Sequence, residues 1–82
     1  MEIFEGREEL KVVERGKITI RFRIIEKKDG SVNSTITVFE KGIAIEHYLS
    51  RYTGNDTELS WNRAVYGQKT MWECLRLKKK EG

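Results

Sequence analysis

The 82-residue sequence has no proline, one histidine and one cysteine, Cys74. A single cysteine cannot close an internal disulfide, and one cysteine with one histidine is too few for the three or four ligands of a zinc site. The glycines occur singly, so no Gly-rich loop that cradles phosphates is present. These shortages argue against a disulfide scaffold, a zinc finger and a nucleotide-dependent enzyme, and we expect no metal and no cofactor.

Long hydrophobic runs are also missing. No stretch approaches the roughly 20 apolar residues of a membrane span, and residues 1–9 are acidic where a secretory signal begins with basic residues. With 38% hydrophobic and 35% charged residues, the chain has enough apolar side chains for one small core. We therefore expect a single domain over residues 1–82, in the cytoplasm and without membrane contact.

The net charge is +3, and its basic excess is concentrated near the C-terminus. Arg76 is followed by Lys78, Lys79 and Lys80, a cluster that fits either a solvated tail or a patch that contacts phosphates. An excess of this size permits nucleic-acid binding without requiring it, because each phosphate contact contributes only a part of the affinity.

Three segments ending in glycine separate runs of β-branched and apolar residues: 14–16, 28–30 and 40–42. Each resembles a three-residue hairpin loop with glycine in the left-handed conformation. The middle loop predicts that Lys27 faces Ser31 and that Phe22 pairs with Ile36. The same rule applied to the first loop pairs Val12 with Ile18 and Leu10 with Ile20, and places Val12 and Leu10 on the core face. The pattern predicts an antiparallel meander of three to four strands.

Residues 18–24 alternate between apolar and polar side chains, which is typical of a strand with one buried face. The register predicts a polar second face with one aromatic residue, formed by Lys17, Thr19, Arg21, Arg23, Asn33, Thr35, Thr37 and Phe39. This face fits an ordinary solvated sheet surface. It also fits a surface on which arginines contact phosphates and Phe39 stacks on a base.

The second half of the chain is less decisive. Residues 43–53 fit a strand to about residue 47 or one helix to residue 53. Residues 55–58 are rich in helix N-cap types, and residues 59–66 predict a short helix ended by Gly67. Residues 69–77 are apolar on both sides and predict a buried closing strand that contains Cys74, although the segment also fits a helix. The expected fold is therefore α+β: the meander, one or two short helices in the middle third, and a C-terminal strand that closes a sheet or a small open barrel.

For function, the preferred hypothesis is a non-enzymatic accessory domain that binds nucleic acid, single-stranded in preference. Its predicted contacts are Lys17, Arg21, Arg23, Phe39, Arg76, Lys78, Lys79 and Lys80. The alternative is a small protein-binding module, such as an adaptor or an enzyme inhibitor of the kind that mobile elements encode. A sheet edge or the region around Trp61 could also form a homodimer contact. A third, weaker hypothesis is a metal-independent ribonuclease built from Glu46, His47, Arg51 and Tyr52.

Overall fold

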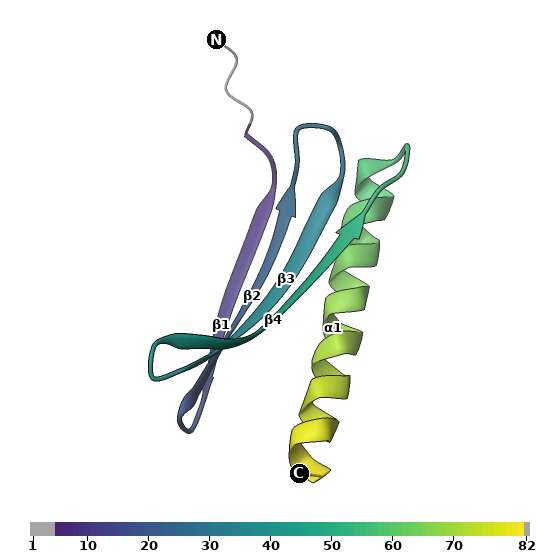
Figure 1. The fold of residues 1–82 in the computed structure, drawn as a ribbon. Helices are drawn as coiled ribbons and strands as arrows, with labels where there is room; N and C mark the ends of the chain where they lie inside the picture. The colour runs from purple at the N-terminus through teal and green to yellow at the C-terminus, as the bar shows by residue number, and fades with distance from the viewer. Residues whose placement is uncertain (1–4, 82) are drawn as a thin grey trace.

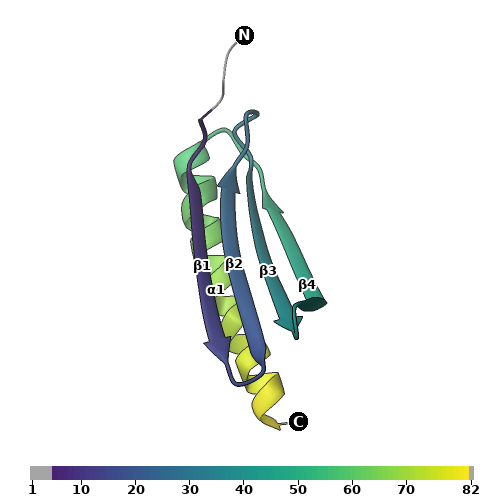
Figure 2. The same ribbon diagram turned by 90° about the vertical axis from the view of Figure 1, so that its left-hand side faces the viewer.

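The computed structural model describes residues 5–81, with side chains to residue 74, as one sheet and one helix (Figure 1). The elements in chain order are β1 (Glu8–Arg15), β2 (Ile18–Glu26), β3 (Val32–Glu40), β4 (Ile43–Tyr52) and α1 (Thr57–Glu81). The four strands form an antiparallel sheet in the order β1-β2-β3-β4. The helix lies along one face of this sheet, and no other described element covers the opposite face (Figure 2).

The α+β class and the antiparallel meander are confirmed, with four strands. The expected helix position is wrong, because α1 begins at Thr57 and continues through Gly67 to Glu81. The closing strand is also wrong: residues 69–77 belong to α1, no strand follows in the described residues, and Cys74 is exposed. Trp61, Ala64, Gln68, Met71 and Trp72 follow one another at the spacing of one helix face, and Met71 and Trp72 pack against the buried side chains of the sheet.

Residues 43–52 form a strand rather than a helix. The β3–β4 loop has two residues, Lys41 and Gly42, whose φ angles are +54° and +79°. Positive φ at both loop positions matches a type I′ turn, whose twist suits two antiparallel strands. This hairpin commits the chain to pairing with β3, and pairing overrides the helical spacing of the apolar residues.

The core lies between the sheet and α1, in two adjoining clusters of buried side chains. The first contains Ile20, Phe22, Ile36 and Val38, and Trp72 of α1 packs edge-on against Phe22 with ring centroids 5.2 Å apart. The second contains Ile24, Val32, Trp61 and Ala64, with Tyr52 at its margin. Alternate residues of β2 and β3 supply most of both clusters, as the period of a half-buried strand requires.

The middle hairpin has the predicted register: Phe22 pairs with Ile36, and the Lys27 amide donates to the Ser31 carbonyl oxygen at 2.7 Å. The first hairpin does not. Its loop has two residues, Gly16 and Lys17, so Val12 pairs with Arg21 instead of Ile18. The observed partner of Val12 lies three residues beyond the expected one. Because this shift is an odd number, every side chain of β1 lies on the opposite face from the one predicted. Val12 and Leu10 therefore lie away from the core, 55% and 56% exposed.

Asp56 begins α1 as its N-cap. Its Oδ1 accepts hydrogen bonds from the amides of Glu58 at 3.0 Å and Leu59 at 3.2 Å. These bonds satisfy amides that have no acceptor inside the helix. Arg7 adds a contact from the N-terminal segment, because its guanidinium pairs with Glu58 at 2.6 Å and lies 4.5 Å from the Trp61 ring centroid.

Two residues in the middle of α1 bring the helix close to the sheet. Gly67 lies against the Tyr52 side chain of β4, and a Cβ at position 67 would overlap the tyrosine hydroxyl oxygen. Gln68 extends between the layers, where its amide nitrogen donates to Ser34 Oγ at 3.2 Å and to the carbonyl oxygens of Arg23 and Thr35 at 3.3 Å. The glycine predicted to end the helix thus permits its close packing.

Candidate functional site

The sheet face opposite α1, termed the open face below, carries the residues that sequence reasoning selected. Cross-strand partners point to the same side of an antiparallel sheet, so the register defines this face. Its members run in four rows from β1 to β4: Glu14, Thr19, Phe39, Ala44; Val12, Arg21, Thr37, His47; Leu10, Arg23, Thr35, Leu49; and Glu8, Ile25, Asn33, Arg51.

Arg21 and Phe39 form the best-defined contact of the open face. The guanidinium carbon of Arg21 lies 5.3 Å from the Phe39 ring centroid, within the range of a cation–π interaction. The Nε atom of Arg21 is buried and has no hydrogen-bond acceptor among the described residues. Arg21 therefore contacts an aromatic ring, and its guanidinium forms no hydrogen bond with the described residues.

Arg23 lies on the same face of β2 and forms an ion pair with Glu8 of β1. The distance between Arg23 Nε and Glu8 Oε1 is 3.3 Å, and both side chains are close to half exposed. An exposed pair of this kind contributes roughly 0–1 kcal/mol, so exchanging the carboxylate for a phosphate costs little. Arg23 is thus available to an anionic ligand.

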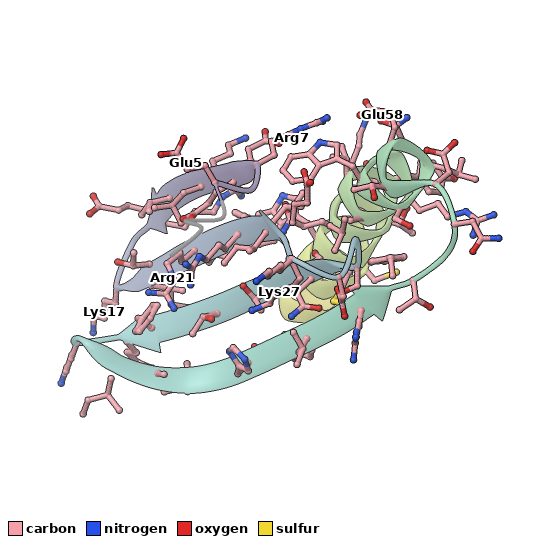
Figure 3. All side chains as sticks on the ribbon, turned by 90° about the horizontal axis from the view of Figure 1, so that it is seen from above. Glu5, Arg7, Lys17, Arg21, Lys27 and Glu58 are labelled. Carbon is pink, nitrogen blue, oxygen red and sulfur yellow. The ribbon has the colours of Figure 1, made fainter. Side chains whose placement is uncertain are left out.

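The structure brings Arg21, Arg23 and Phe39 together on neighbouring strands. Lys17 is exposed in the β1–β2 turn, and Figure 3 shows Lys17 and Arg21 toward one end of the sheet and Lys27 toward the other. The last turns of α1 contain the basic residues predicted near the C-terminus, Arg76, Lys78, Lys79 and Lys80. The structure describes the backbone of these residues but not their side chains. The backbone of this segment is at the β1–β2 turn end of the molecule, in the helical layer (Figure 2).

Sequence reasoning missed the aliphatic margins of the open face. Leu10 and Val12 on β1 and Leu49 on β4 are 55–61% exposed and flank the polar centre formed by β2 and β3. The alternation of residues 43–49 could have indicated that Leu49 shares a face with His47. Leu10 and Val12 were expected in the core because the register of the first hairpin was wrong. The face is therefore cationic and threonine-rich along its middle. Its outer strands combine these exposed aliphatic side chains with charged or polar ones, Glu8 and Glu14 on β1 and His47 and Arg51 on β4.

The residues of the ribonuclease hypothesis do not converge. Glu46 and Tyr52 share the helix-facing side of β4, while His47 and Arg51 lie on the open face. His47 Nδ1 is 2.9 Å from Thr37 Oγ1. On the helix-facing side, partial burial, followed by the neighbouring Glu46 carboxylate, raises the pKa of Tyr48. A base, an acid and a cation are therefore not aimed at one phosphate.

Among the described residues, no three His, Cys, Asp or Glu side chains gather where they could hold a metal ion. Across the same part of the chain, no helix is both long enough and apolar enough to cross a membrane. Comparison with protein-family models, curated proteins and solved structures finds no match.

Proposed function

We propose that this protein is a non-enzymatic accessory domain that binds single-stranded nucleic acid on the open face. The observation that carries the proposal is the uncovered placement of Arg21 and Arg23 on a central strand, with Phe39 against Arg21. Guanidinium groups contact phosphates, and aromatic or guanidinium planes stack on bases. An uncovered sheet presents both kinds of group on one surface.

The shape of the sheet favours a single strand over a duplex. Three interstrand spacings of about 4.8 Å make the sheet about 14 Å wide between β1 and β4. That width exceeds the roughly 12 Å major groove of B-DNA, which admits a helix or a two-stranded ribbon. Unstacked bases can instead lie on the sheet, where Phe39, Leu10 and Leu49 provide apolar surface. Thr19 and Thr35, which are partly exposed, provide hydroxyl groups.

The test is fluorescence anisotropy with labelled single- and double-stranded DNA and RNA of about 15 nucleotides, at about 50 and 200 mM salt. Two to three phosphate contacts on a single strand give a salt slope of about −1.4 to −2.1, hence a loss of roughly 7- to 18-fold in affinity over this range. We expect micromolar binding that prefers the single strand.

The variant R21A/R23A removes two charges from the open face and should weaken binding to all sequences while it flattens the salt slope. The matched control R63A/K69A removes two exposed charges from α1, in the other layer, and should keep most of the affinity. Equal losses in both variants, or no binding at 50 mM salt, would rule out the open face as a nucleic-acid surface.

The exposed aliphatic margins favour one second candidate, a protein-binding module that works as an adaptor or inhibitor. Leu10, Val12 and Leu49 would then pack against a partner, or against a second copy of the chain. Sedimentation analysis distinguishes the second copy, because L10K/L49K should return a dimer to the monomer. If this second candidate is correct, both the wild type and R21A/R23A should show negligible affinity for nucleic acid.

A further inference from the structure

A hollow of about 420 Å³ opens at the β2–β3 turn, beside the last row of the open face. It is lined by Lys27, Lys28, Asp29, Ser31, Asn33 and Arg51, and is termed the turn hollow below. The lysines come from the turn, whereas Arg51 reaches the hollow from β4, the strand next to β3. Three cationic side chains from two separate segments thus meet one carboxylate, which leaves a formal charge of +2.

The carboxylate of Asp29 organises this group. Its Oδ1 accepts hydrogen bonds from the Ser31 hydroxyl at 2.6 Å and the Ser31 amide at 2.9 Å, while Oδ2 accepts from the Arg51 guanidinium at 3.0 Å. The hydrogen bonds from Ser31, together with the Arg51 charge, lower the pKa of Asp29. Asp29 therefore stays ionised and pairs with Arg51 at the hollow, while the remaining guanidinium donors can face a ligand.

Asn33 supplies an acceptor that lacks a partner. Its Oδ1 is buried and accepts no hydrogen bond from the described residues. Buried polar atoms are nearly always paired, so this oxygen favours a ligand that brings an N–H or O–H group. The hollow thus offers cations for an anionic group and, next to them, an acceptor for a hydrogen-bond donor.

The turn hollow also continues the line of arginines on the open face. Asn33 and Arg51 occupy the row that follows Arg23, and Arg23 occupies the row that follows Arg21. Successive positions on one face of a strand are about 6.8 Å apart, twice the rise per residue. Arg21, Arg23 and the turn hollow therefore form three cationic positions along the direction of β2.

We propose that the turn hollow is a phosphate-binding site that holds one phosphate of the strand bound on the open face, with Asn33 accepting from the sugar hydroxyl or base amino group beside it. This inference rests on the proposed function and extends it. Lys27 and Lys28 contact the phosphate from the turn, and Arg51 contacts it from β4. The bound strand then runs along β2 toward the β2–β3 turn.

The test compares K27A/K28A with K11A/K69A, which removes two lysines outside both the open face and the hollow. With labelled RNA oligoadenylate of about 15 nucleotides, which carries both sugar hydroxyls and base amino groups, K27A/K28A should lose at least about fivefold in affinity. Its salt slope should fall by up to about 0.7, the change for one phosphate contact on a single strand. The control should lose less than twofold. Equal behaviour of the two variants, with the wild type still binding, would overturn the hollow and leave the open face standing.

A second readout separates this inference from the proposed function. Pyrophosphate is titrated into ¹⁵N-labelled wild type and K27A/K28A, and the amide signals of Ser31 and Asn33 are followed by NMR. If no oligonucleotide binds, the proposed function fails. Even in that case, saturable shifts in the wild type would support a phosphate site for free phosphorylated molecules, provided that K27A/K28A does not show them. The absence of shifts in the wild type would overturn the site as well.

Discussion

Replacing Gly67 by alanine tests the contact between α1 and β4. In an isolated helix this change is favourable by about 1 kcal/mol, because glycine is among the poorest helix formers. Here the new methyl group overlaps the Tyr52 hydroxyl oxygen and lies 3.2 Å from the ring carbon that bears it. The ring is rigid, so it must swing away from the cluster that contains Trp61 and Val32.

The two effects can be compared. A tyrosine buries 150–250 Å², and losing the contact of about half of that area, roughly 100 Å², costs about 2.5 kcal/mol. Subtracting the gain in helix propensity leaves G67A destabilised by about 1.5 kcal/mol. For a chain of this length, that shift lowers Tm by roughly 6–12 °C.

The double variant with Y52F makes the test sharp. Without the hydroxyl oxygen the closest ring atom is at 3.2 Å, and a displacement of a few tenths of an ångström accommodates the methyl group. G67A in the Y52F background should therefore be neutral or stabilising by up to about 1 kcal/mol. Urea denaturation followed by circular dichroism gives all four free energies of unfolding. The same cost of G67A in both backgrounds, or a gain in the wild type, would show that this contact does not restrict position 67.

Three further expectations concern stability. Asp56→Ala should cost about 1 kcal/mol in urea denaturation because two amides at the start of α1 lose their acceptor, whereas Asp56→Asn should retain most of the wild-type value. Val12→Thr should stay within about 0.5 kcal/mol of the wild type while Val13→Thr costs about 1 kcal/mol, and the reverse order would contradict the β1 register. For Asp29, whose pKa is lowered on folding, the wild type should exceed Asp29→Asn in stability above about pH 5. That difference should vanish as the pH falls through the lowered pKa, and a difference that persists in acid would exclude the ionised carboxylate as its source.

The register of the middle hairpin could be predicted because its turn residues fit one loop length. Asp29 folds back onto Ser31, and Gly30 adopts φ +88° at the third loop position. Gly16 was ambiguous, since one glycine suits the first position of a two-residue loop as well as the third position of a three-residue loop. The strand before it is apolar on both faces, with Leu10 and Val12 on one and Val13 on the other, so burial could not decide the register from sequence.

The helix was misjudged for a different reason. Gly67 carries a local stop signal, but its role depends on Tyr52, a residue of another element that closes against it only in the folded protein. Candidate site residues on β2 and β3 were predictable because the alternation of Arg21 and Arg23 survives any change in β1. The aliphatic margins and the turn hollow were not predictable, because each joins strands whose register had to be known first.

Because the core lies on one side of the sheet, alternate residues of each strand face either the core or the open face. On β2, Ile20, Phe22 and Ile24 carry stability, while the intervening Arg21 and Arg23 contact neither α1 nor the buried clusters through their side chains. A substitution on the open face therefore need not alter the packing beneath it. The alternate residues of the open face are for this reason a suitable target for libraries that install binding surfaces at constant stability.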